Sequence, residues 1–171
     1  SSVPDMDSDG GDEILIGSEY TNGSSPEEGA AYLFLSATLA ADPITTAASA
    51  DYTFTGHASA YDYFGYVVAS GDANADGIND ILIGTPLDDT SGTDAGAAYF
   101  YDGAELLALP PGTIDMTVPA YGLAIFTGTN PGDNFCASAT FYDYDGDGDD
   151  DLAIGAPYDS TSYTDAGAVN I

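Results

Sequence analysis

Residues 72–84 read Asp72-Ala-Asn-Ala-Asp-Gly-Ile-Asn-Asp-Ile-Leu-Ile-Gly84, an acidic loop that runs directly into a short apolar segment. The same pattern occurs earlier as Asp5-Met-Asp-Ser-Asp-Gly-Gly-Asp-Glu-Ile-Leu-Ile-Gly17 and later as Asp143-Tyr-Asp-Gly-Asp-Gly-Asp-Asp-Asp-Leu-Ala-Ile-Gly155. The copies begin 67 and 71 residues apart. Self-similarity at a nearly fixed spacing is the sequence signature of a repeat architecture.

Further markers recur in the same order around each acidic motif. Twelve residues after each closing glycine, a second glycine is followed by alanine, at Gly29, Gly96 and Gly167. A phenylalanine, Phe64 or Phe135, lies eight residues before the second and third acidic motifs. Because these markers keep their order and spacing, the chain is expected to consist of copies of one structural unit.

The segments between these markers are typical of β-strands. They are short, rich in β-branched and aromatic residues, and bounded by Gly, Pro, Asn and Asp, as in Ile81-Leu-Ile83 and Leu123-Ala-Ile-Phe126. Helical periodicity is not convincing anywhere, although Glu105–Leu109 could form one turn before Pro110. Each unit of about 70 residues is therefore expected to contain four strands, as a propeller blade does.

The sequence thus predicts an all-β fold of β-propeller-type blades, each with four antiparallel strands, about two and a half in number. Residues 1–63 are expected to form a partial blade that lacks its first strand. Residues 64–134 form a complete blade, and residues 135–171 form a partial blade that lacks its fourth strand. Without an initiator methionine or a signal-like leader, the sequence is expected to be a mature or excised segment.

The charge of the chain restricts its function. Its 171 residues include 29 Asp plus Glu, one His and no Lys or Arg, which gives a formal net charge of −29. Nucleic acids and anionic membrane surfaces are bound through basic side chains, so neither is an expected partner. No apolar run is long enough for membrane insertion. Since 44% of the residues are hydrophobic, the chain is expected to fold, with cations offsetting its self-repulsion.

Each acidic motif supplies the oxygen ligands that Ca²⁺ prefers. In the pattern D-x-D-x-D-G-x-x-D, side chains at positions 1, 3, 5 and 9 and the carbonyl at position 7 converge on one point, and glycine at position 6 permits the sharp turn. The sequence therefore predicts three Ca²⁺ sites. The expected ligands are Asp5, Asp7, Asp9, the Gly11 carbonyl and Glu13 in loop one; Asp72, Asn74, Asp76, the Ile78 carbonyl and Asp80 in loop two; and Asp143, Asp145, Asp147, the Asp149 carbonyl and Asp151 in loop three.

Other interpretations of the loops fit less well. An EF-hand needs a bidentate Glu at position 12, where this chain has Ile16, Ile83 and Ile154. Mg²⁺ requires octahedral geometry and keeps several waters, so Ca²⁺ is the better match. If the loops were only solvated turns without a ligand, nothing would explain why the same acidic motif occurs three times, each time directly before an equivalent apolar strand. A glycosidase would need a carboxylic acid as proton donor, whereas metal-bound carboxylates stay ionised, so no enzymatic activity is expected.

Three single residues outside the acidic loops are candidates for other chemistry. His57 has no second histidine or lysine to work with and is expected in a surface turn. Cys136 is expected to be a small buried residue, because no cationic neighbour is available to activate its thiol. Asn22 heads the sequence Asn22-Gly-Ser24 and is a candidate for N-glycosylation.

The combined markers resemble the FG-GAP repeat, which is found in the β-propellers of integrin α-subunits and in many bacterial surface proteins. The resemblance rests on Phe64-Gly65, the loop of residues 72–80, Ile83-Gly-Thr-Pro86 and Gly96-Ala-Ala-Tyr-Phe-Tyr101, and it extends over essentially the whole chain. The resemblance implies a blade with a Ca²⁺ loop between its first and second strands.

The sequence departs from the repeat pattern in three places. Cys136 replaces the glycine of the Phe-Gly pair in the last copy, and Ser18 and Glu19 replace Ala-Pro in the first copy. Asn74 replaces an aspartate in loop two, which removes one charge but keeps an oxygen ligand. Loop two is therefore expected to be the weakest site.

These observations favour a calcium-stabilised structural or adhesion module of an extracellular or cell-surface protein. The expected partners are other copies of the chain, which could build an array or filament, or further blades of the same chain. Two alternatives remain open at this point. One is a lectin-like propeller that binds glycans, and the other is a non-catalytic propeller segment of a larger secreted hydrolase.

Overall fold

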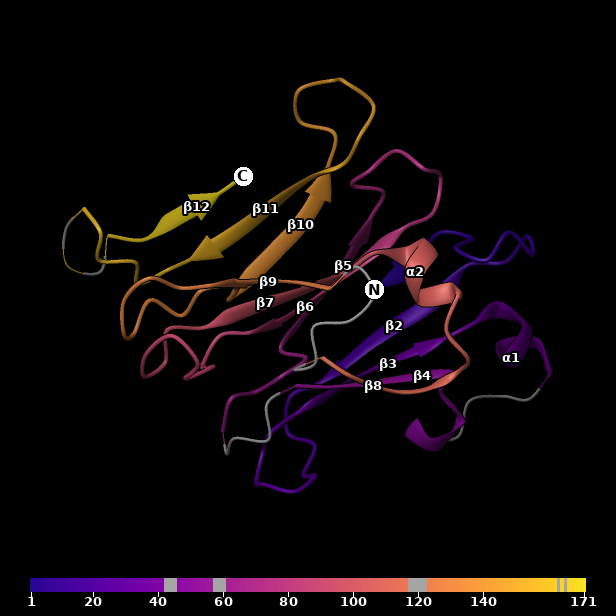
Figure 1. Cartoon of the computed structure of the whole chain (residues 1–171), viewed down its shortest axis with the longest axis horizontal. Coiled ribbons are helices and arrows are strands. Elements are labelled where there is room, and N and C mark those ends of the chain that lie inside the picture. The colour runs from indigo at the N-terminus through magenta and orange to yellow at the C-terminus, as the bar shows by residue number, and fades with distance from the viewer. Residues whose placement is uncertain (42–45, 57–60, 117–122, 163, 165) are drawn as a thin grey trace.

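The computed structural model describes residues 1–41, 46–56, 61–116, 123–162, 164 and 166–171 of the chain. Twelve strands form three separate sheets in the described part of the chain, and the few helices are short. Figure 1 shows the three sheets following one another from the indigo N-terminal part to the yellow C-terminal part. This confirms the predicted all-β fold, and the sheets are consistent with partial β-propeller blades.

The second sheet contains four strands in the order β5-β6-β7-β9. They are β5 (Val67–Gly71), β6 (Asp80–Thr85), β7 (Ala97–Tyr101) and β9 (Leu123–Thr127). All three neighbouring pairs are antiparallel, as the sequence predicts for a complete blade.

The first sheet contains five strands in the order β1-β2-β3-β4-β8. They are β1 (Ser2–Val3), β2 (Glu13–Ser18), β3 (Ala30–Phe34), β4 (Tyr52–Thr55) and β8 (Gly112–Asp115). The sequence predicts that this unit lacks its first strand. The structure has a two-residue strand, β1, at that place, and β1 pairs with β2. Part of a first strand is therefore present.

Strand β8 is the main departure from the expected topology. It lies between β7 and β9 in the sequence, yet it pairs in parallel with β4 of the first sheet. The N–H groups of Gly112 and Met116 each donate 2.8 Å hydrogen bonds to carbonyls at the two ends of β4, those of Asp51 and Thr55. The first sheet therefore contains a parallel strand pair that the sequence did not predict, because a segment of the second unit covers its outer edge.

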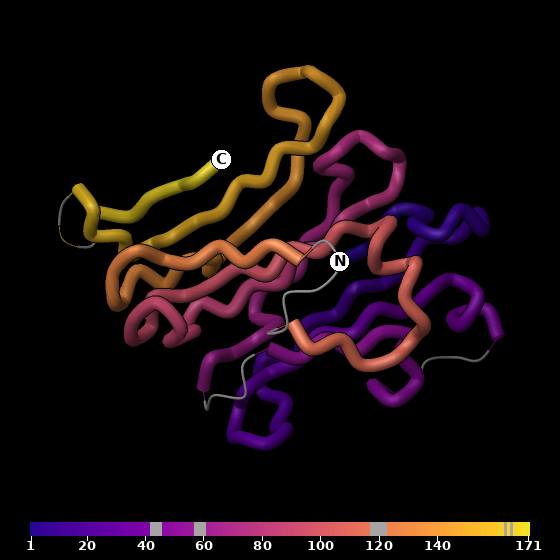
Figure 2. The backbone as a smooth tube through the Cα atoms, viewed as in Figure 1, coloured from indigo at the N-terminus to yellow at the C-terminus, as the bar shows by residue number. Residues whose placement is uncertain are grey.

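The third sheet has the strand order β10-β11-β12 and only antiparallel pairs. Its strands are β10 (Ser138–Tyr142), β11 (Asp151–Ala156) and β12 (Ala168–Asn170). The tube in Figure 2 shows this sheet at one end of the molecule and the first sheet at the other. The second sheet therefore has a neighbour on each side.

Short helices occupy two of the connections. α2 (Gly103–Leu107) forms where the sequence allowed one turn, and the Asp102 side chain caps it by accepting a 2.9 Å hydrogen bond from Glu105 N–H. α1 (Ser36–Ala41) and the single 3₁₀ turn Ala47–Ser49 follow β3. Neither was predicted, because neither buries a residue and so neither carries an amphipathic pattern.

Two hydrophobic clusters fill the spaces between successive sheets. In the first cluster, Leu15 and Leu33 of the first sheet pack with Ile81 and Ile83 of the second sheet. In the second cluster, Leu82 packs with residues of the third sheet. Strand β6 is buried along its whole length because successive side chains point to opposite sheets. The core is thus divided by the second sheet.

Candidate metal-binding loops

The three acidic loops occupy equivalent places in the three sheets. Residues 5–13 join β1 to β2, residues 72–80 join β5 to β6, and residues 143–151 join β10 to β11. Each loop therefore connects the first two strands of its sheet, as the resemblance to the FG-GAP repeat implied.

One hydrogen-bond pattern shapes all three loops. The side chain at position 3 accepts from the N–H of position 5, and the side chain at position 5 accepts from the N–H of position 7. These distances lie between 2.8 and 3.1 Å. The residues that form the pattern are Asp7, Asp9 and Gly11 in loop one; Asn74, Asp76 and Ile78 in loop two; and Asp145, Asp147 and Asp149 in loop three. These two hydrogen bonds are thus common to all three turns.

The first-position carboxylate closes each turn from the other side. Asp5 Oδ1 accepts a 3.1 Å hydrogen bond from Gly10 N–H, and Asp72 Oδ2 accepts a 2.8 Å hydrogen bond from Gly77 N–H. In loop three Asp143 Oδ1 accepts instead from Gly146 N–H at 2.7 Å. The sixth-position glycines have φ angles of +94° (Gly10), +86° (Gly77) and +102° (Gly148), in the left-handed region that favours glycine.

This folding brings carboxylates together in two of the loops. In loop one, the carboxylate oxygens of Asp5, Asp7 and Asp9 lie within 4.8 Å of one another. In loop three, the carboxylate oxygens of Asp143, Asp145 and Asp151 also lie within 4.8 Å of one another. With no cation beside them such groups repel, so this grouping is suited to a bound cation.

Loop two is different, as its asparagine predicts. The Asn74 side chain turns its amide toward Asp102, to which Nδ2 donates a 2.9 Å hydrogen bond. Among the described residues, loop two forms no group of three acidic side chains comparable to those in the other loops. Asp102 was not among the predicted site residues, because it lies 28 positions away and is brought to the loop by α2.

The ninth-position carboxylate has a role that the ligand pattern did not reveal. In every loop one of its oxygens accepts a hydrogen bond from the N–H of position 2. The pairs are Glu13 with Met6 at 2.5 Å, Asp80 with Ala73 at 3.0 Å, and Asp151 with Tyr144 at 3.0 Å. Position 9 is the first residue of the second strand. Its carboxylate therefore holds the first residues of the loop against the start of that strand.

Burial changes the acidity of two of these carboxylates. Glu13 is fully buried, and desolvation raises its pKa. Its Oε1 is buried without a hydrogen-bond partner in the described part of the chain. Asp80 is also fully buried, and desolvation raises its pKa to about 6, although the N–H groups of Gly103 and Ala73 oppose the shift. A bound cation would offset both desolvation costs.

Neighbouring segments tune two further carboxylates. The Ser36 hydroxyl lies 2.5 and 2.6 Å from the two carboxylate oxygens of Asp9, and this hydrogen bond is the largest cause that lowers the pKa of Asp9. Asp149 has a raised pKa, first through desolvation and then through the carboxylates around it, which include Asp72 of loop two. Loops two and three therefore share one acidic region.

The comparisons with known proteins agree with the geometry of the loops and strands. A family model described as the FG-GAP repeat matches residues 64–101 and 135–169, which run from each Phe-small pair through the acidic loop to the third strand of the second and third sheets. This chain contains FG-GAP repeats. The sequence predicts both repeats from the same residues, and residues 1–63, which carry the first copy of the acidic motif, lie outside the two matched segments.

Similar FG-GAP segments occur in much longer proteins. The chain is 36% identical over 110 residues to phosphatidylinositol-glycan-specific phospholipase D of Rattus norvegicus, a match that covers 64% of this chain and 12% of that protein. It is 35% identical over 113 residues to integrin alpha-5 of Xenopus laevis, with 63% and 10% covered. Integrin alpha-8 of Gallus gallus is 35% identical over 113 residues, with 61% and 10% covered. The chain thus spans about a tenth of the length of these relatives.

Cys136 occupies the glycine position of its FG-GAP repeat, as the sequence predicts. It is fully buried and free, with a φ angle of +64°, close to the +86° of the equivalent Gly65. Burial raises the pKa of the Cys136 thiol to about 12. The expectation of a small buried residue at this position is confirmed, and the raised pKa disfavours the reactive thiolate.

The remaining singled-out residues lie away from the loops. Asn22 is exposed between β2 and β3, where its Oδ1 accepts a 2.8 Å hydrogen bond from Glu27 N–H. Its glycosylation stays a prediction. His57 lies outside the described residues. Within the described part of the chain, no helix has the length and hydrophobicity needed to cross a membrane.

Proposed function

We propose that this FG-GAP chain is a calcium-stabilised structural or adhesion module of an extracellular or cell-surface protein, with no catalytic role of its own. The observation that carries the proposal is the threefold repetition of one hydrogen-bonded acidic turn in a chain without Lys or Arg. Without basic side chains, cations are the only partners able to neutralise these turns.

The proposed ligands are those named from the sequence. In each loop they are the side chains at positions 1, 3, 5 and 9 and the carbonyl at position 7. The partnerless Oε1 of the buried Glu13 supports a cation in loop one, because an isolated buried carboxylate oxygen is costly. The carboxylate groups in loops one and three match the hard oxygen ligands that Ca²⁺ takes.

Calcium would supply a large share of the stability of the chain. Extracellular Ca²⁺ modules have dissociation constants on the order of 10⁻⁴ M or weaker. Calcium at about 100 times this constant stabilises a folded protein by ~2.7 kcal/mol per site. Three such sites would rival the total of roughly 5–15 kcal/mol that ordinary domains have. This requirement supports an extracellular setting, as does the resemblance to cell-surface repeats.

The test is a melting curve of the chain in calcium, in magnesium and in excess EDTA. We expect EDTA to lower the melting temperature by more than about 10 °C, and magnesium to restore little of the loss. Coincident curves in calcium and EDTA would contradict the proposal.

A second candidate is the non-catalytic propeller segment of a larger hydrolase. The likeness to phosphatidylinositol-glycan-specific phospholipase D favours it. The two candidates share the calcium loops and differ in the rest of the parent protein. The sequence that flanks this segment would separate them, because a hydrolase domain on the same polypeptide would support the second. Glycan binding stays a prediction, for which a glycan array is the test.

The proposed partners are other copies of the chain or further blades. Exposed sheet edges favour pairing with additional strands. Self-assembly into an array or filament would appear in light scattering of the isolated chain in millimolar calcium, and a stable monomer with both end sheets ordered would exclude it.

A further inference from the structure

One carboxylate outside the acidic motifs lies directly beside loop two. Asp102 is the N-cap residue of α2 and is half-buried, 28 positions away from Asn74 in the sequence. Its Oδ2 accepts a 2.9 Å hydrogen bond from Asn74 Nδ2, and its Oδ1 accepts one of 2.9 Å from Glu105 N–H. One oxygen of Asp102 therefore serves the helix and the other serves the loop.

The connection that carries Asp102 is packed closely against loop two. Gly103 N–H donates a 2.8 Å hydrogen bond to Oδ1 of Asp80, the ninth-position carboxylate. A Cβ at Gly103 would lie 2.2 Å from the carbonyl oxygen of Asn79, so the first residue of α2 touches the backbone of the loop. Desolvation is the main cause of the raised pKa of Asp80, and the charge of Asp102 adds to it. Asp102 is thus within electrostatic reach of two proposed ligands, Asn74 and Asp80.

Asn74 needs such a partner because only one end of its amide can bind a cation. Its Oδ1 is turned as the Oδ1 atoms of Asp7 and Asp145 are, since each accepts a hydrogen bond of 3.0–3.1 Å from the N–H two residues further on. An aspartate presents an oxygen in either orientation, whereas a flipped asparagine would present its NH₂ group to the cation. The hydrogen bond to Asp102 therefore holds the Asn74 oxygen toward the loop.

The first unit has neither the asparagine nor the extra carboxylate. Leu35 lies 67 residues before Asp102, which is also the spacing between loops one and two, and its side chain packs against the hydrophobic core. The residue after it, Ser36, donates its backbone N–H to the ninth-position carboxylate of its loop, as Gly103 does. The two connections are therefore equivalent, and an aspartate stands beside the loop only where position 3 is an asparagine.

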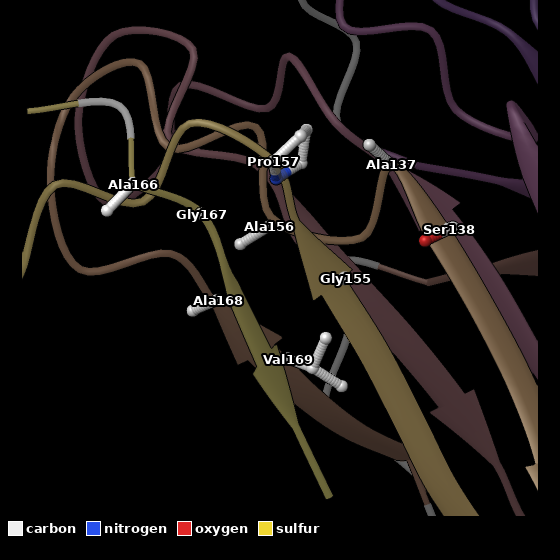
Figure 3. Close-up of a pocket in the computed structure, with 9 residues that line it drawn as sticks. All are labelled: Ala137, Ser138, Gly155, Ala156, Pro157, Ala166, Gly167, Ala168 and Val169. Carbon is white, nitrogen blue, oxygen red and sulfur yellow. The ribbon is translucent and has the colours of Figure 1, made fainter.

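The hollow between β10, β11 and β12 provides a contrast. Figure 3 labels the nine residues that line it, and they are alanines, glycines, a proline, a serine and a valine. This lining offers a cation no carboxylate, although carboxylate oxygens are the ligands that Ca²⁺ prefers. Cation binding is therefore inferred at the loops alone, where Asp102 adds a carboxylate to loop two.

We propose that Asp102 is a positioning residue of the loop-two cation site, which orients Asn74 and supplies the negative charge that the asparagine lacks. This inference rests on the proposed calcium binding and adds a residue to it. Counted with Asp102, loop two has four acidic side chains, as many as the ligand positions of loops one and three have; they are Asp72, Asp76, Asp80 and Asp102. Loop two is then expected to bind calcium about as tightly as the other loops, in place of the lower affinity that its sequence alone predicts.

The experiment is an NMR calcium titration of the chain, followed at the amide signals of Gly10, Gly77 and Gly148. Each of these glycines is the sixth residue of one loop, so the three dissociation constants are read separately. The osmolyte TMAO is present because it favours the folded state at low calcium. Asp102→Ser keeps a good N-cap for α2, but it removes the charge and the acceptor of Asn74 Nδ2. We expect it to weaken calcium binding at loop two at least about tenfold and to leave loops one and three unchanged.

Two further variants separate this role from helix capping and from a general charge effect. Asn74→Asp in the Asp102→Ser background is the rescue, because an aspartate needs no orienting partner and returns the lost charge. It should restore the calcium affinity of loop two, although the cap of α2 is the same serine in both variants. Glu105→Gln is the matched control, because it removes one charge from an exposed position of the same helix. It should leave all three dissociation constants unchanged.

Three results would overturn the inference. They are an unchanged calcium affinity at Gly77 in Asp102→Ser, an equal loss of affinity in Glu105→Gln, and no recovery when Asn74→Asp is added. Failure of the calcium proposal looks different, because none of the three glycine signals would then respond to calcium in the unchanged chain. A response at Gly10 and Gly148 without one at Gly77 would remove loop two alone from the proposed function, and this inference with it.

Discussion

The backbone N–H of Asp150 donates a 2.8 Å hydrogen bond to the carbonyl oxygen of Asp72, whose own N–H donates to Oδ2 of Asp150 at 3.0 Å. This reciprocal pair joins loop three to loop two, although the residues are 78 positions apart. Asp72 is a first-position ligand candidate, so a change in loop three reaches the cation site proposed for loop two.

The first prediction concerns this pair. Asp150→Ala removes the acceptor of Asp72 N–H, and we expect it to lower the free energy of unfolding in calcium by about 1 kcal/mol. Asp150→Asn removes the same charge but keeps an acceptor oxygen, so it should cost less. Urea unfolding of both variants measures the difference. Equal stability of the two variants would mean that the hydrogen bond contributes nothing.

The second prediction concerns the asparagine of loop two. Asn74→Asp restores the aspartate of the other loops, but it places a carboxylate where the amide now donates to Asp102. We expect a lower melting temperature in EDTA, from the new repulsion, and a larger stabilisation by calcium. In a control, Asp102→Asn combined with Asn74→Asp should relieve the loss in EDTA. A calcium-induced stabilisation no larger than that of the unchanged chain would argue against a cation in loop two.

The third prediction concerns pH and Asp80. Burial raises its pKa from the usual 3.8 to about 6, so the folded state holds its proton more tightly than the unfolded state does. In EDTA this group therefore stabilises the fold fully below pH 4, and the contribution is lost as the pH rises through 6. Asp80→Asn does not titrate, so its stability relative to the unchanged chain should rise between pH 4 and 6. A constant difference across that range would contradict the shift.

The acidic loops were predictable because their information is local. Nine consecutive residues carry the ligands, the glycine and the turn, and the structure repeats the same hydrogen bonds in each copy. Asp102 and Ser36 could not be predicted beside the loops, because α2 and the start of α1 bring them there from distant positions.

Burial was less predictable than the strands themselves. Ile14-Leu15-Ile16 and Ile81-Leu82-Ile83 are the same tripeptide in equivalent strands. Ile14 and Ile16 are 36% and 42% exposed, whereas all three residues of the second copy are fully buried. The difference arises because the second sheet has neighbours on both faces, which depends on the order of units rather than on the strand sequence.

The last prediction concerns β8, the strand that lies between β7 and β9 in the sequence but pairs with β4 of the first sheet. Met116 follows β8, is fully buried in the cluster between the first two sheets, and is held by its N–H bond to the Thr55 carbonyl. If this crossing segment is part of the folded unit, Met116→Ala leaves a cavity and should cost about 2–5 kcal/mol. Thr113→Ala, at an exposed position of the same strand, is the matched control and should cost less than about 1 kcal/mol. Denaturant unfolding in calcium compares them, and equal stability of the two variants would show that β8 does not pack on the first sheet in solution.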